Sequence, residues 1–110
     1  MILYSADADA DRALLQQLLG LPYVDAGGGW LIQQLPPGEV AVHPAESSGA
    51  AEPFLVCDDV EATSAELTAQ GVVVGGGITD ERWGRRTTIQ LPGGGTVGLY
   101  EARHPTAFDL

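Results

Sequence analysis

Residues 88–94 have the sequence TIQLPGG, and an earlier stretch, residues 32–38, has the closely similar sequence IQQLPPG. Each stretch follows an apolar run and precedes an alternating one, EVAVH at 39–43 and TVGLY at 96–100. The matching leucines, Leu35 and Leu91, are separated by about half of the 110 residues. Self-similarity with this period indicates a duplicated structural unit, so the second half of the chain is expected to repeat the first.

The first half shows the signals of one helix among four strands. Carboxylates crowd the expected start of the helix, where they cap free amides and oppose the helix dipole. Leucines at i, i+4 spacing form an apolar stripe, and Gly20 followed by Pro22 ends the helix. The expected elements are a strand at 1–5, a helix from 7 to 19, and strands at 23–24, 30–35 and 39–43, the last two joined by a hairpin.

The second half repeats this order. Asp58 is expected to cap the second helix, with Glu61 at capping-box spacing, and Gly71 is expected to end it. Strands are expected at 54–57, 72–74, 87–91 and 96–101, with a loop opening at 75–77. The chain is therefore predicted to be one α+β domain, 1–110, made of two βαβββ units: unit 1 at 1–44, a linker at 45–52, unit 2 at 53–103 and a tail at 104–110.

The net charge of the chain limits the kinds of partner that it is expected to bind. There are 15 acidic and 5 basic residues, giving a net charge of −10, while 45% of the residues are hydrophobic. Such a surface repels phosphate backbones and anionic lipids, so we expect neither nucleic acid nor a membrane as partner. The single cysteine, Cys57, lies in an apolar run and is expected to be a buried structural thiol. With no signal segment visible, a cytoplasmic protein is expected.

Three stretches carry a family resemblance: DDVEA at 58–62, WGRR at 83–86 and LPGGGTVGLYE at 91–101. With its two βαβββ units, the chain resembles the vicinal oxygen chelate superfamily, also called the glyoxalase/bleomycin-resistance/dioxygenase proteins. The resemblance implies that two curved sheets form an incomplete barrel, or cup, with the helices outside. It also implies a homodimer, a state that open sheet edges support. Members include metal-dependent enzymes and metal-free binding proteins, so the fold alone does not fix the activity.

The resemblance places possible metal ligands at the strand ends that line the cup. Matched to this chain, those positions give His43, Glu52 and Glu101, while the fourth falls at the N-terminus. The direction of the His43 side chain depends on a one-residue register between the hairpins. The alternative for His43 is a half-buried strand histidine, and His104 is expected in an exposed tail. A divalent Ni, Zn, Mn or Fe ion is therefore expected only if the protein is a metal-dependent lyase, isomerase or dioxygenase.

Other residues suggest ligand binding or acid/base chemistry. Glu101, expected to face the cup beside apolar neighbours, is a candidate general base or a hydrogen-bond acceptor. Trp30 and Trp83 each stand near the start of equivalent strands, where they would stack on a flat ligand or pack at the rim. Of Arg85 and Arg86, one is expected to pair with surface carboxylates; Arg85 is taken as the candidate ligand contact. The first hypothesis is a small-molecule binding protein without an essential cofactor; the metal-dependent enzyme is the alternative.

Overall fold

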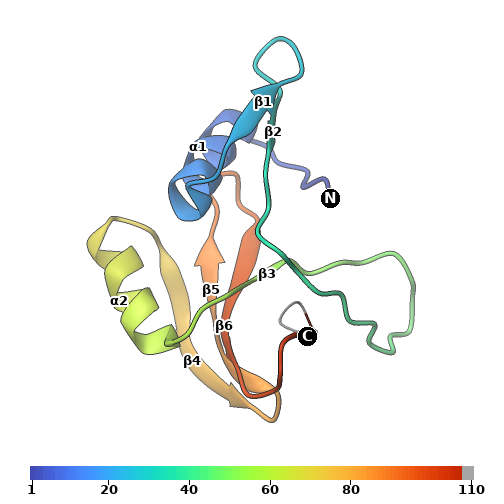
Figure 1. The fold of residues 1–110 in the computed structure, drawn as a ribbon, viewed down its shortest axis with the longest axis vertical. Helices are drawn as coiled ribbons and strands as arrows, with labels where there is room; N and C mark the ends of the chain where they lie inside the picture. Colours follow the sequence, from blue (N-terminus) through green and yellow to red (C-terminus); the bar gives the residue numbers. More distant parts are fainter. Residues whose placement is uncertain (108–110) are drawn as a thin grey trace.

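The computed structural model describes residues 1–107 of the chain. It is an α+β fold in which each of the two helices within residues 1–107 is followed by three strands (Figure 1). The elements are α1 (Ala8–Leu19), β1 (Tyr23–Asp25), β2 (Leu31–Gln33), β3 (Phe54–Val56), α2 (Val60–Ala69), β4 (Val74–Glu81), β5 (Gly84–Gln90) and β6 (Thr96–Ala102).

The second half forms the expected βαβββ unit. Its sheet has the order β3-β6-β5-β4, in which β3 runs parallel to β6 and the other neighbours are antiparallel. Helix α2 covers one face of this sheet, and Val60 of α2 and Ile89 of β5 are fully buried between them. The apolar alternation of β6 places Val97 and Leu99 toward the same layer, because successive side chains of a strand point to opposite faces.

Two details of this unit differ from the sequence prediction. Asp59, not Asp58, caps α2, since its side chain accepts a hydrogen bond from the N–H of Ala62. Residues 75–77 do not open a loop; they lie within β4 as a bulge, where the register with β5 shifts. Gly76 and Gly77 have φ angles of 82° and 70°, a backbone conformation that favours glycine.

The first half departs further from the prediction. Residues 1–5 and 39–43 form no strand, and β2 pairs with β1 rather than with residues 39–43. The turn between residues 30–35 and 39–43 contains two prolines, Pro36 and Pro37, where the equivalent turn of the second unit contains only Pro92. Val40 and Val42 consequently remain 91% and 95% exposed. Within residues 1–107, the first unit therefore contributes a helix and a two-stranded hairpin instead of a second four-stranded sheet.

Helix α1 joins the first half to the second at the β5–β6 turn, as Figure 1 shows. Asp11, only 7% exposed, accepts a hydrogen bond of 2.8 Å from the N–H of Gly93 in this turn. Leu14 and Leu18 pack against the core under α2. The glycine-rich turn that reveals the sequence repeat is thus the place where the two halves meet.

Candidate functional site

The four-stranded sheet has two faces with different chemistry. The face toward α2, called here the helix face, carries Ile89 and Leu99 and is filled by the apolar core. The opposite face, called the open face, carries Phe54, Arg86 and Tyr100 from three neighbouring strands. Since α2 leaves the open face uncovered, this face is the inner wall of the expected cup.

Three aromatic rings meet on the open face. Phe54 and Trp83 have centroids 6.0 Å apart, Phe54 and Tyr100 5.5 Å, and Trp83 and Tyr100 5.3 Å, all in edge-to-face geometry. We call these residues the aromatic cluster. Edge-to-face contacts of this kind each contribute about 0.5–1.5 kcal/mol beyond area burial. In this cluster Trp83 packs against two rings that sequence reasoning did not single out. The register between β3 and β6 places Phe54 and Tyr100 on the same face.

Gly98 explains why the Phe54 ring can lie flat on the sheet. The two residues are register partners in β3 and β6. A Cβ at position 98 would overlap the Phe54 ring, whose Cγ would be only 3.0 Å away. A glycine within a strand often marks such a close approach. Gly98 therefore leaves the space that the Phe54 ring of the aromatic cluster occupies, a role that is seen only in the packing.

The two adjacent arginines point to opposite faces. Arg85, the predicted ligand contact, lies on the helix side, where its Nη2 is 2.6 Å from Glu61 and its Nε is 3.6 Å from Asp80. The hydrogen bond to Glu61 is the largest cause of the raised pKa of Arg85. The guanidinium of Arg86 instead lies 5.8 Å from the Phe54 centroid, a cation–π distance. Arg86 is thus the arginine that reaches the open face.

A pocket of about 160 Å³ opens beside the aromatic cluster. Its walls come from the linker and from three strands, and they are formed by Ala51, Glu52, Pro53, Phe54, Arg86, Thr88, Thr96 and Gly98. Pockets for drug-sized ligands usually measure about 300–1,000 Å³. This pocket therefore fits part of such a ligand, whose remaining surface would extend over the aromatic cluster.

Two of the predicted site residues lie away from the aromatic cluster. Trp30 directly precedes β2, as predicted, and is 56% exposed on the hairpin that Figure 1 shows beyond α1. His43 is exposed, and its Nδ1 lies 2.8 Å from the carbonyl oxygen of the neighbouring Pro44. Of the predicted set, Glu52 lines the open-face pocket and Trp83 contacts Phe54, which also lines it. Arg86, the arginine that was not chosen as the ligand contact, lines this pocket as well.

Glu101 does not lie in the cup. Its Oε1 accepts a hydrogen bond of 3.1 Å from the N–H of Val60 at the start of α2. The prediction that Glu101 shares a face with Val97 and Leu99 is correct, but that face is the helix face. A carboxylate there satisfies a free amide and opposes the helix dipole. The expected placement of Glu101 as a general base deep in the cup was wrong, because its carboxylate is hydrogen-bonded to the first turn of α2.

The structure also fails to gather the proposed metal ligands. In the described part of the chain, no group of three or more His, Cys, Asp and Glu side chains is arranged to hold a metal ion. His43 is held in the linker region, Glu52 borders the open-face pocket, and Glu101 caps α2. His43, Glu52 and Glu101 therefore do not fit the coordination of one shared divalent ion.

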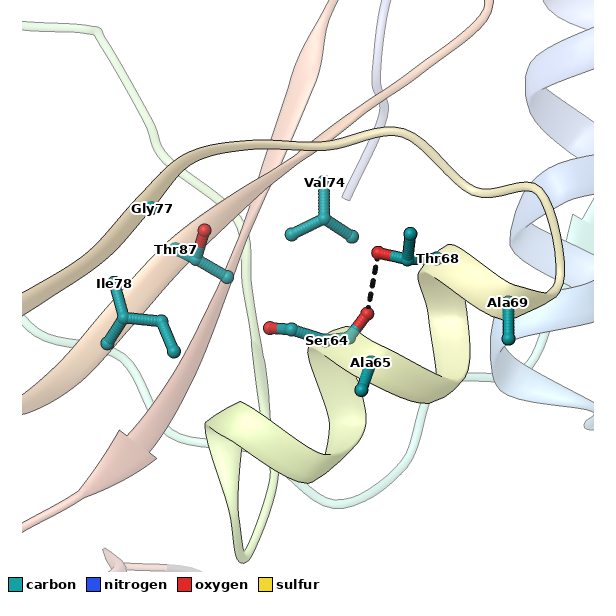
Figure 2. Close-up of a pocket in the computed structure, with 8 residues that line it drawn as sticks. All are labelled: Ser64, Ala65, Thr68, Ala69, Val74, Gly77, Ile78 and Thr87. Atoms are coloured by element: carbon teal, nitrogen blue, oxygen red, sulfur yellow. Dashed lines mark hydrogen bonds between the residues drawn. The ribbon is translucent and has the colours of Figure 1, made fainter.

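A larger hollow of about 590 Å³ lies on the other side of the sheet, between α2 and β4 (Figure 2). Small side chains of α2 face the bulge of β4 across it, and its walls are Ser64, Ala65, Thr68, Ala69, Val74, Gly77, Ile78 and Thr87. Within residues 1–107 the buried Ser64 hydroxyl has no hydrogen-bond partner, while the Thr68 hydroxyl donates to the Ser64 carbonyl. Because this hollow holds neither charge nor aromatic ring, we favour the smaller open-face pocket as the functional site.

Comparisons with known proteins agree with this fold. No protein-family model matches the sequence, and no curated protein matches it. Among solved structures, an antibiotic-binding protein of Streptomyces sp. CB03234, TnmS3, is 25% identical, with a TM-score of 0.62 over 91% of this chain and 90% of that one. A lactoylglutathione lyase of Agrobacterium tumefaciens is 16% identical, with a TM-score of 0.61 over 89% of this chain and 87% of that one.

A glyoxalase/bleomycin resistance protein, also from Streptomyces sp. CB03234, is 21% identical, with a TM-score of 0.51 over 89% of this chain and 94% of that one. At 16% and 21% identity, these similarities concern the fold alone. The chain therefore has the fold of the glyoxalase/bleomycin-resistance proteins, in agreement with the resemblance seen in its sequence. Within residues 1–107, no helix is both long and apolar enough to cross a membrane.

Proposed function

We propose that this protein binds a flat aromatic small molecule on the open face of its four-stranded sheet. The observation that carries the proposal is the aromatic cluster with Arg86 beside it, next to a pocket of about 160 Å³. Aromatic walls with a few placed polar groups are typical of small-molecule sites. The antibiotic-binding neighbour, at 25% identity, supports the same function.

Tryptophan fluorescence tests this proposal, because the chain has two tryptophans and only Trp83 belongs to the aromatic cluster. A panel of two- and three-ring aromatic compounds is titrated into the Trp30→Phe and Trp83→Phe variants. We expect saturable quenching in Trp30→Phe, where Trp83 reports, and little in Trp83→Phe. Quenching confined to Trp83→Phe would place the ligand at the hairpin and overturn the proposal.

We further propose that binding needs no metal ion and takes place in the cytoplasm. The donors expected to hold a metal stand apart, and the one cysteine, Cys57, is a free thiol. Affinity for the quenching compound should therefore be unchanged after dialysis against a chelator. A loss of affinity that added Zn, Ni, Mn or Fe restores would contradict this part of the proposal.

A second copy of the chain is proposed to complete the cup. The accessible surface is 7777 Å², about 2,000 Å² more than a compact monomer of this mass would expose. The radius of gyration, 14.6 Å, also exceeds the value of about 13 Å expected for this length. Much of the excess is apolar and lies on the unpaired segments that hold Ile2, Tyr4, Val40 and Val42. A stable interface needs only about 800 Å² per partner, so a homodimer accounts for this exposed surface.

Sedimentation velocity tests the dimer. We expect a species of twice the 11.5 kDa chain mass at micromolar concentration. The Val40→Asp/Val42→Asp variant should shift the protein to monomer, because a buried carboxylate is costly. Val73→Asp is the control: Val73 is likewise exposed, at 62%, but it directly precedes β4 and lies outside the unpaired segments. A monomeric wild-type protein, or equal dissociation by both changes, would contradict the proposal.

A further inference from the structure

One carboxylate of the chain already lies at the edge of the aromatic cluster. The hydroxyl of Tyr100 donates a hydrogen bond of 3.1 Å to Oε1 of Glu39. The backbone N–H of Ala107 donates one of 2.7 Å to Oε2 of the same carboxylate. Two donors, one from β6 and one from the segment that follows it, thus converge on the two oxygens of a single anion.

The segment that supplies Glu39 is largely exposed. It connects β2 to β3 and, in Figure 1, makes a long excursion to the right of the sheet. Its neighbouring valines, Val40 and Val42, are almost fully exposed. The Glu39 carboxylate is therefore a tether that holds an extended segment against the open face.

The donor groups that hold Glu39 suit a carboxylate in general. Tyr100 is 8% exposed, and burial, followed by the hydrogen bond to Glu39, raises the pKa of its phenol from the ordinary value of 10.0. The hydroxyl therefore keeps its proton at neutral pH and remains a donor. Arg86 is the register partner of Tyr100 and forms no ion pair with residues 1–107. The same corner of the open face thus offers two neutral donors and a nearby cation.

We propose that this corner is an anion subsite and that Glu39 occupies it as an internal competitor for an aromatic carboxylic acid. In the bound state, the ligand's rings lie against the aromatic cluster. Its carboxylate replaces Glu39 on Tyr100 and Ala107, and the Glu39 segment is released. This inference rests on the proposed function, because the rings of the ligand must first bind the open face.

The test compares two carboxylates of the same segment. Glu39→Ala and Glu46→Ala change the net charge of the protein equally, but only Glu39 is hydrogen-bonded to Tyr100, and Glu46 is exposed. Each is made in the Trp30→Phe background and titrated with 2-naphthoate and its neutral analogue 2-naphthamide, with Trp83 fluorescence as the readout. Charge-assisted hydrogen bonds are strong enough that Glu39→Ala should bind 2-naphthoate about tenfold more tightly. Glu46→Ala should change this affinity by less than about twofold.

Tyr100→Phe supplies a second, conservative variant, since it removes the donor hydroxyl and keeps the ring. Combined with Glu39→Ala, it should abolish the gain for 2-naphthoate and leave the affinity for 2-naphthamide within about twofold. If both compounds quench Trp83 but Glu39→Ala and Glu46→Ala behave alike, the anion subsite is overturned and the proposed function stands. If neither compound quenches Trp83 in any variant, both are overturned.

Discussion

Gly98→Ala is the sharpest mutational test of how the aromatic cluster packs on the open face. Gly98 does not have a positive φ, so alanine is compatible with the backbone and only the packing opposes it. The new methyl group would overlap the ring of Phe54, which would have to leave its edge-to-face contacts with Trp83 and Tyr100. Overpacking of this kind costs about 1–3 kcal/mol, and we expect the free energy of unfolding to fall by that amount.

A double-mutant cycle shows whether the collision is with Phe54. For a domain of this size, the expected loss corresponds to a fall in Tm of roughly 5–15 °C, measured by circular dichroism. In the Phe54→Ala background, Gly98→Ala should cost less than about 0.5 kcal/mol, because the ring is gone. Gly95→Ala is the matched control, since its nearest neighbour would be Leu91 Cδ1 at 3.8 Å. An equal cost of Gly98→Ala with and without the Phe54 ring would refute this account of the open face.

Three further predictions concern stability. Glu101→Ala should lower the free energy of unfolding by about 1–2 kcal/mol, because it removes the acceptor of the Val60 N–H. It should leave ligand affinity unchanged. A loss of binding with unchanged stability would instead show that Glu101 acts in the cup. Gly93→Ala should cost about 1–3 kcal/mol in urea unfolding, because its methyl group would overlap Ser5 Oγ and would lie 2.8 Å from Asp11 Oδ2 of α1. A near-neutral effect would show that the contact between α1 and the β5–β6 turn adapts easily. Burial raises the pKa of the Cys57 thiol from 9.0, so the folded protein binds more protons than the unfolded chain at higher pH. The stability from this group is therefore present below about pH 9 and lost as the pH rises above it, and Cys57→Ala should flatten that decline.

The second unit was predictable because its signals are local. The glycine-rich turn, the alternation of β6 and the acidic start of α2 all depend on residues close together in the chain. The first unit was not, because pairing of residues 1–5 and 39–43 requires a neighbouring edge that the sequence does not specify. The apolar run at 1–5 and the alternation at 39–43 indicate a tendency to form strands but do not specify a partner strand.

The site was predictable in kind but not in its residues. Choosing between Arg85 and Arg86 depends on a single step of strand alternation, which reverses the face. The shared face of Glu101, Val97 and Leu99 followed from the same rule, but only the position of α2 shows that it is the helix face. Gly98 has no side chain to suggest a role, and its importance appears only with the Phe54 ring above it.

The central claim is that ligands bind the open face rather than the larger hollow under α2. Amide chemical-shift mapping by NMR, with 2-naphthoate added to the labelled protein, distinguishes these two places directly. We predict that the largest shifts occur at Thr88, Gly98 and Tyr100, together with the indole N–H of Trp83. Shifts concentrated instead at Ala65, Ala69 and Ile78, which line the hollow in Figure 2, would contradict the account.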